Sequence, residues 1–374
     1  MERLPAALLA LATALSLVVF DVRAEASFDA PRRLAAMLGI AAALTALAFV
    51  RDVRVRPWTR GQKAIVACAG GAALLALLSA WLSPHRAVAL DALRTIIVFA
   101  MIPLIAALAE DAWRWVTHAF VAAAGLHAIV SLGQALGVAQ PLSFAGGGGR
   151  GTASGLIGNS GLLGLVCALA LLLLVPRLTR KSFATWALAA ILLAAMAINR
   201  SITPFAALLA GLLVQMPWAR ARAAVASLAI VFAFAATDAA TGTLARVDEL
   251  LSYRIGPWKA AVAMIAERPL LGYGAGSYGA EYARHADVRF ANPHLIGSFA
   301  QAHNDLLQSA AELGLPAALL LAAALLLLVR GGRDRVVVSI LVAGAVASLT
   351  WFPLQRPETA MLLLAACGRA WRDA

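Results

Sequence analysis

The chain has 374 residues, of which 62% are hydrophobic and only 13% are charged, and its mean hydropathy is +0.83. Soluble domains are about 45–50% apolar and about 25% charged, so this composition excludes an ordinary soluble protein and predicts an all-α protein that crosses a membrane many times. The formal charge is +12, but the basic residues fall in short clusters between apolar runs, without a stripe of interleaved aromatic residues. This pattern excludes nucleic acid as a partner and favours contact with anionic membrane lipid.

The first apolar run, from Leu4 to Phe20, allows two interpretations. It precedes Ala24-Glu-Ala26, which resembles the cleavage site of a signal peptide. The charged residues Asp21, Arg23 and Glu25 are unusual before such a site, so we favour a first transmembrane helix.

Apolar runs close to membrane-spanning length recur along the rest of the chain. We predict twelve transmembrane helices, over residues 4–20, 34–50, 64–82, 88–109, 115–138, 155–175, 183–198, 202–217, 223–239, 303–329, 336–352 and 358–370. With the N-terminus in the cytoplasm, the inner segments hold 17 Lys and Arg residues and the short outer loops hold 7. Because short cytoplasmic segments are enriched in Lys and Arg, this bias predicts that both termini are cytoplasmic.

The longest polar interruption runs from Thr241 to Ala302 and lies outside in this topology. The predicted organisation is therefore nine helices in residues 1–240, an outer loop in residues 241–302, and three helices in residues 303–374. A membrane protein that places most of its polar residues in one loop is expected to have its chemistry there.

Within the loop, Leu251 to Glu267 has the apolar spacing of an amphipathic helix, which brings Arg254 and Trp258 together four residues apart. Pro269 ends this helix and begins the glycine-rich stretch Pro269 to Ser277, where glycines permit a close backbone approach. A phosphate cradle remains open as an interpretation of that stretch, although no strand precedes it and no lysine follows.

A second helix is predicted from His303 to Leu313, with Gly314 as its stop and Pro316 opening the next membrane helix. His303 would stand at a helix start, where the helix dipole disfavours imidazolium and keeps the side chain available as a base. The guanidinium of Arg254 can hold a phosphate group bidentately.

Four stretches of the chain together resemble the O-antigen ligase and polymerase superfamily of bacterial envelope glycosyltransferases. The stretches are Arg150-Gly-Thr-Ala-Ser-Gly-Leu-Ile-Gly-Asn-Ser, Asn199-Arg200-Ser201, Tyr253-Arg254 through Trp258 to Arg268-Pro-Leu-Leu-Gly-Tyr-Gly, and Ala302-His-Asn-Asp-Leu-Leu-Gln-Ser-Ala-Ala-Glu-Leu-Gly. The resemblance covers approximately residues 145–324, and it departs from the family's usual Ser-Arg-Gly at Asn199 and Ser201.

The resemblance, most of all to O-antigen ligases, implies an inverting transfer at the periplasmic face of the bacterial inner membrane, without metal or cofactor. The donor would be an undecaprenyl-pyrophosphate-linked glycan and the acceptor a hydroxyl of lipid A-core. Arg200 and Arg254 would bind pyrophosphate, His303 would be the catalytic base, and Arg150 and Trp258 would be further substrate-binding residues.

Other interpretations stay open. A polymerase would use the same donor but join it to a second lipid-linked chain. A transporter would have ionisable residues near the middle of the bilayer, where Arg94, His118 and His127 are the notable ones here. Arg200 and Arg254 could also be ordinary interfacial or solvated arginines, and His303 could be a core residue.

Overall fold

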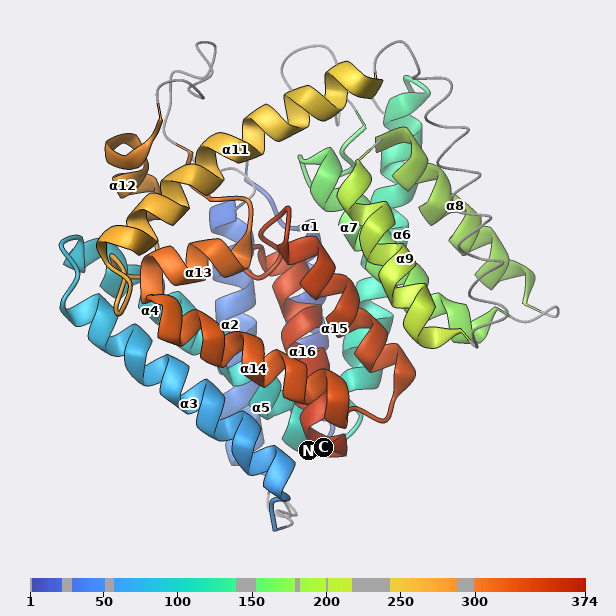
Figure 1. The fold of residues 1–374 in the computed structure, drawn as a ribbon. Coiled ribbons are helices and arrows are strands. Elements are labelled where there is room, and N and C mark those ends of the chain that lie inside the picture. Colours follow the sequence, from blue (N-terminus) through green and yellow to red (C-terminus); the bar gives the residue numbers. More distant parts are fainter. Residues whose placement is uncertain are drawn as a thin grey trace.

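The computed structural model describes residues 2–21, 29–50, 57–138, 153–178, 182–199, 201–216, 243–287 and 299–374, and of residues 243–253 only the backbone. Every regular element within these ranges is helical, as the composition predicts (Figure 1). The helices before the loop are α1 (Leu4–Val18), α2 (Asp29–Ala48), α3 (Arg60–Trp81), α4 (Arg86–Phe99), α5 (Met101–Leu108), α6 (Ala112–Ala135), α7 (Ser160–Leu174), the 3-10 turn η2 (Val175–Arg177), α8 (Phe183–Asn199) and α9 (Ile202–Gln215). The later helices are α11 (Thr243–Glu267), α12 (Tyr278–His285), α13 (Asp305–Leu313), α14 (Leu315–Gly331), α15 (Arg335–Ser348) and α16 (Pro357–Asp373).

Most of the predicted segments coincide with helices of the structure to within a few residues. The run 303–329 divides at Gly314 into α13 and α14, as the sequence predicts, and the run 88–109 divides near Ala100 into α4 and α5. Among the described residues, five helical segments are long and apolar enough to cross a membrane, and five shorter helices are also apolar. The segment 223–239 lies outside the described residues, so twelve transmembrane helices and an outer loop stay predictions.

Polar side chains at the helix starts explain several of these boundaries. Asn159 accepts a hydrogen bond from the backbone N–H of Leu162 at 2.9 Å and so begins α7. Thr59 and Gln62 form a reciprocal capping box at the start of α3. Such side chains satisfy backbone N–H groups that have no partner inside the helix.

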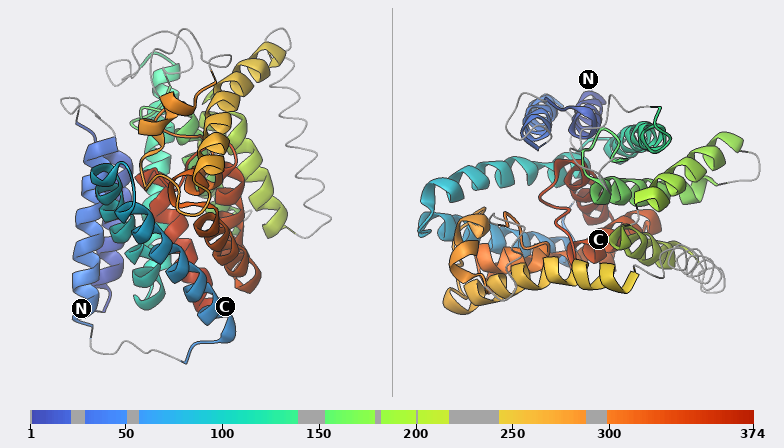
Figure 2. Two further views of the ribbon diagram at one scale, coloured as in Figure 1. Left: turned by 60° about the vertical axis from the view of Figure 1, so that its left-hand side comes forward. Right: turned by 90° about the horizontal axis from the view of Figure 1, so that it is seen from above.

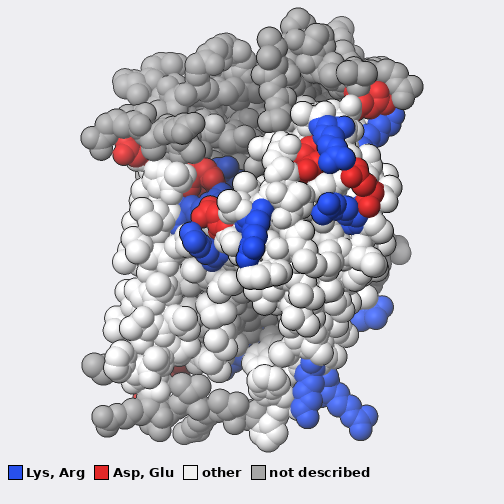
Figure 3. Space-filling model, turned by 90° about the vertical axis from the view of Figure 1, so that its left-hand side faces the viewer, with Lys and Arg blue, Asp and Glu red and all other residues white. Residues whose placement is uncertain are grey.

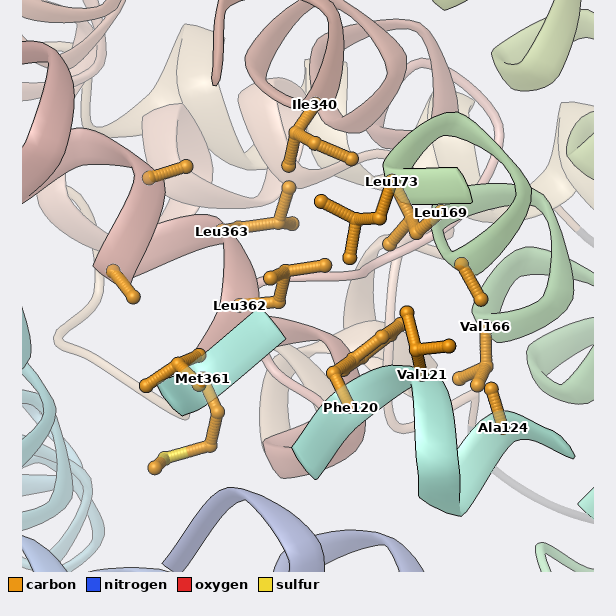
Figure 4. Close-up of a cluster of buried hydrophobic side chains, with 14 of the residues drawn as sticks. Phe120, Val121, Ala124, Val166, Leu169, Leu173, Ile340, Met361, Leu362 and Leu363 are labelled. Atoms are coloured by element: carbon orange, nitrogen blue, oxygen red, sulfur yellow. The ribbon is translucent and has the colours of Figure 1, made fainter. Parts of the chain in front are cut away.

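Helix α7 is the centre of the hydrophobic core. Every residue from Leu162 to Leu174 is buried, whereas half of the residues of α3 are exposed. Leu169 and Leu173 of α7 pack beside Phe120 of α6 and Leu363 of α16 (Figure 4). A helix that is apolar all round and enclosed on all sides is typical of the middle of a bundle.

The outer surface of the bundle separates charged from uncharged regions. On the face in Figure 3, charged side chains lie mainly in the upper half and at the lower edge, with an uncharged band between them. Large apolar side chains on the lipid-exposed helices, such as Leu74, Leu77 and Trp81 of α3, are exposed. This arrangement is that of a membrane protein surrounded by hydrocarbon.

The two termini lie apart from each other but at the same end of the bundle, and α11 and α12 lie at the opposite end (Figures 1 and 2). The polar loop therefore forms a cap on one end. It is joined to the bundle through α13, which packs against α11 and α14.

A fully buried ion pair connects distant parts of the bundle near that cap. Arg32 of α2 donates to Glu358 of α16 at 2.7 Å, and it also donates to the carbonyl oxygens of Leu156 and Ile157 at 2.5 and 3.1 Å. The sequence suggested an outer-loop position for Arg32, but the residue is on a helix and completely buried. It fixes the segment that leads into α7.

Candidate active site

His303 has an unusual backbone conformation. Its φ of 55° is in the left-handed region, which non-glycine residues seldom adopt. The flanking residues are held on both sides: the N–H of Ala302 donates to Gln308 at 2.9 Å, and the side chain of Asn304 donates to the carbonyl oxygen of Leu349 at 3.0 Å. A strained residue fixed in this way by its neighbours is typical of a functional site.

The ring of His303 lies in an aromatic cluster. Its centroid is 5.1 Å from that of Phe352, 5.7 Å from that of Trp351 and 6.0 Å from that of Phe299, all in edge contacts. Its Nδ1 lies 3.2 Å from the carbonyl oxygen of Gln301. A proton on Nδ1 that is donated to this carbonyl leaves Nε2 with a free lone pair, as a general base requires.

The electrostatic surroundings keep this imidazole neutral. Burial and the positive charge of Arg254 lower the pKa of His303 from 6.5 to about 4. The predicted helix from His303 to Leu313 begins two residues later, at Asp305, with Asn304 as its cap. His303 precedes that cap, and desolvation together with a neighbouring cation disfavours its charged form.

Arg254 projects from α11 toward the same cluster. Its Cζ lies 5.3 Å from the centroid of the Trp351 ring, a cation–π distance. Burial lowers the pKa of Arg254 to about 10, so the side chain stays charged at neutral pH. In the described parts of the chain no carboxylate pairs with Arg254, which leaves its charge available for an anion.

Trp258 follows Arg254 by four residues on α11, as the sequence predicts. Its side chain is half-buried, and its indole N–H has no acceptor among the described residues. The indole N–H of Trp351 is also buried without an acceptor there. Within the described parts of the chain, two indole donors without acceptors thus accompany a cation without a carboxylate partner.

The connection between α15 and α16 supplies Trp351 and Phe352, which the sequence did not identify as part of the site. Asp305 holds this connection by accepting hydrogen bonds from Ser348 at 3.1 Å, from the N–H of Leu354 at 3.1 Å and from Gln355 at 3.2 Å. Burial raises the pKa of Asp305 to about 6. An acidic residue two positions after His303 was visible in the sequence, but its partners about 50 residues later were not.

The starts of α7 and α9 also reach this cluster. A Cβ built on Gly161 would lie 3.5 Å from the Trp351 ring, 3.5 Å from the side chain of Asn159 and 3.7 Å from that of Ser201. Thr203 of α9 shares a 2.7 Å hydrogen bond with Thr350, next to Trp351. Residues of the first two sequence stretches, Asn159 and Ser201, therefore lie near Gly161, which itself neighbours the indole contacted by Arg254 and His303.

Two predicted site residues, Arg150 and Arg200, lie outside the described residues. Asn159 and Ser201, which belong to the same stretches, are described and lie beside Gly161 at the edge of the cluster. The other three predicted site residues are described: Arg254 and Trp258 lie on α11, and His303 lies just before Asn304, the cap of α13.

The glycine-rich stretch after α11 has a structural role. The N–H groups of Tyr273 and Gly274 donate to the carbonyl oxygens of Ala311 and Glu312, at 3.1 and 2.7 Å. The buried carboxylate of Glu312 accepts from the N–H of Gly276 at 2.9 Å. Because protein acceptors occupy these donors, the stretch docks the loop onto α13, and its use as a phosphate cradle is not supported.

In the described parts of the chain, no group of three or more His, Cys, Asp or Glu side chains is placed to hold a metal ion. His285 lies 2.9 Å from Glu267, and His85 lies 2.7 Å from Glu281. The second of these contacts joins α12 to the start of α4. The first pair joins α11 to α12 within the loop, and the second fastens the loop to the bundle.

Comparison with known proteins agrees with the motifs around this cluster. A family model described as O-antigen ligase matches residues 157–322, which include Asn159, Arg254 and His303 but not Trp351. No curated protein matches the chain.

Proposed function

We propose that this chain, which belongs to the O-antigen ligase superfamily through residues 157–322, is an O-antigen ligase that moves a glycan from undecaprenyl pyrophosphate to a hydroxyl of lipid A-core. The family implies glycosyl transfer in a membrane. The observation that carries the finer proposal is that an arginine without a carboxylate partner among the described residues and a neutral histidine both contact Trp351.

Arg254 binds the pyrophosphate of the glycan donor in the proposed reaction. A pyrophosphate carries several negative charges, and a guanidinium binds two of its oxygens at once. Arg254 has no carboxylate partner among the described residues and is partly desolvated, so its attraction for an anion is less screened than on an open surface. Arg200 adds a second guanidinium in the proposal, since the neighbouring Ser201 lies beside Gly161, which also neighbours Trp351. Arg150 and Trp258 would contact the same donor.

His303 activates the acceptor hydroxyl in the proposed reaction. In the proposed step, Nε2 takes the proton from the acceptor hydroxyl while the hydroxyl oxygen bonds to the anomeric carbon of the donor. The bond from that carbon to the phosphate oxygen breaks, and its electron pair leaves with the polyprenyl pyrophosphate. Attack from the face opposite the leaving group inverts the anomeric carbon. The two arginines stabilise the charge that develops on the leaving oxygen, and His303 then releases its proton.

The arrangement of the chain supports a reaction on one side of the membrane. The cap of α11 and α12 lies at the end opposite the two termini (Figure 2), and α11 of that cap carries Arg254. With the termini in the cytoplasm, as the charge bias predicts, the cap faces the periplasm.

The deciding experiment supplies the purified chain with an undecaprenyl-pyrophosphate-linked glycan and one of two acceptors. Lipid A-core as acceptor should give a glycan-capped lipid A, and His303→Asn should abolish it. A second lipid-linked glycan tests the polymerase alternative, in which longer chains would stay on the polyprenyl carrier. Polymer without capped lipid A would replace the ligase proposal, and the absence of both products would overturn glycosyl transfer.

A further inference from the structure

The α15–α16 connection lies beyond the residues that the family model matches, yet it contributes to the cluster around His303. We propose that Trp351 is a positioning residue, whose indole holds Arg254 and His303 in one fixed arrangement and joins them to the start of α7. The catalytic consequence of this inference rests on the proposed function. The arrangement of the three side chains is independent of that function.

Trp351 contacts each part of the site by a different edge or face. The Cζ of Arg254 is 5.3 Å from its ring centroid, the ring of His303 meets it edge-on at 5.7 Å, and its Cη2 lies 3.5 Å from a Cβ built on Gly161. A planar indole can make these contacts at once because it is wide and rigid and has only two rotatable side-chain bonds. Arg254 and His303 are otherwise carried by separate segments, α11 and the residue pair before α13.

The indole is itself held in place. Phe352 stacks on it with centroids 4.9 Å apart and an interplanar angle of 12°. Thr350 bonds to Thr203 of α9 at 2.7 Å, and Asp305 holds the backbone of Leu354. Trp351 is thus fixed by α9 and α13 as well as by its own connection, and it transmits that rigidity to the two reacting side chains. Precise placement of this kind contributes to catalysis because small displacements of reacting groups cost much of the rate.

Two substitutions separate positioning from a general effect on folding. Trp351→Phe keeps an aromatic face and edge, whereas Trp351→Ala removes them. Trp186→Phe is the matched control, since Trp186 lies on α8 with 51% of its surface exposed. Amounts of folded protein are compared by size-exclusion profile in detergent before any other measurement.

The first measurement needs no substrate. Exchange of the His303 ring hydrogen with deuterium, followed by mass spectrometry against pH, reports the pKa of this side chain in each variant. Removal of the indole in Trp351→Ala exposes the imidazole, and we expect the exchange midpoint to rise by about one pH unit. In Trp351→Phe and Trp186→Phe it should stay near the wild-type value. An unchanged midpoint in folded Trp351→Ala would overturn the inference even if the chain proved not to be a transferase.

The second measurement is transfer with lipid-linked donor, once the wild-type chain is shown to be active. Trp351→Ala should raise KM for the donor and lower kcat, each by about 10-fold, because both Arg254 and His303 lose their support. Trp351→Phe should recover most of both parameters. A loss that appears only as less folded enzyme, with KM and kcat per folded molecule unchanged, would contradict positioning. Equal losses in Phe and Ala variants would also contradict it, since they would point to the indole N–H. If the wild-type chain is inactive with this donor, the proposed function is rejected, and the positioning inference is then decided by the exchange measurement.

Discussion

Arg254 and His303 contact the same indole: the Cζ of Arg254 lies 5.3 Å from the Trp351 ring centroid and the ring of His303 lies 5.7 Å from it. The two side chains are also coupled electrostatically, because the charge on Arg254 contributes to the lowered pKa of His303. A cation that holds a pyrophosphate and a base that deprotonates an acceptor hydroxyl would have to be neighbours in this way. The coupling leads to predictions about each residue and about pH.

The first prediction concerns the base. His303→Asn should lower transfer by about 10²–10⁴-fold, the usual contribution of a general base. Asn is chosen because it tolerates the left-handed backbone at φ 55° better than Ala does. The variant should elute from size exclusion as wild type does. His118→Asn on the exposed face of α6 is the control and should keep full activity. Activity above about a tenth of wild type in His303→Asn would reject the base role.

The second prediction concerns the cation. Arg254→Lys keeps the charge but loses the bidentate fork, so kcat/KM for the donor should fall about 10- to 100-fold. Steady-state kinetics with varied donor concentration measure this. Arg284→Lys, on the exposed surface of α12, provides the control and should change kcat/KM by less than about 2-fold. Equal kinetics for Arg254→Lys and wild type would mean that a point charge is sufficient there.

The sequence was most informative where local chemistry decides structure. The apolar periodicity of α11, the stop at Gly314 and the placement of Arg254 one turn before Trp258 all follow from spacing and turn residues. The positions of His303 and Arg254 in a common cluster follow from the family resemblance and not from spacing. The left-handed backbone of His303 leaves no local signal, because it is imposed by Gln308 and Leu349.

Long-range contacts explain what the sequence could not predict. Trp351 looked like the end of a membrane helix, and its role depends on α7, α9 and α11. Arg32 looked like a loop residue, and its burial depends on Glu358, 326 positions later. Neither partner can be identified from a single sequence, since a charged residue near a helix end is ordinarily exposed at the interface.

The third prediction concerns Asp305, which fixes the α15–α16 connection. Asp305→Ala leaves the N–H of Leu354 and the side chains of Ser348 and Gln355 without their acceptor, and it should destabilise the protein by about 1–3 kcal/mol. Thermal unfolding in detergent measures the loss as a lower Tm. Asp91→Ala on the exposed face of α4 is the control and should leave Tm unchanged. A Tm shift no larger than that of the control would show that Asp305 does not fix the connection.

The fourth prediction concerns topology. Ser277 in the loop is fully buried, so the exposed Ala283 on α12 is the better labelling position. In a chain without Cys68, Cys167 and Cys367, Ala283→Cys should react with a membrane-impermeant maleimide added to intact spheroplasts. Arg333→Cys, between α14 and α15, should react only after the membrane is opened. The reverse pattern would place the cap in the cytoplasm and would remove the proposed periplasmic reaction.

The last prediction is a difference between two pH profiles. His303 acts as a base only when it is neutral, so activity falls as pH drops through its pKa, and in the free protein burial and Arg254 hold that pKa at about 4. The pyrophosphate of a bound donor compensates the charge of Arg254, which removes one cause of the lowered pKa and raises it in the complex. The acidic limb of kcat, which reports the complex, should therefore lie at higher pH than that of kcat/KM, which reports the free protein. Replacing Arg254 with Gln removes the same charge before the donor arrives, so the two limbs should move together in that variant. The profiles are measured from about pH 3 to 8, so that points lie below the lower limb, with saturating acceptor and varied donor. Limbs that already coincide in the wild-type chain would show that donor binding does not change the basicity of His303.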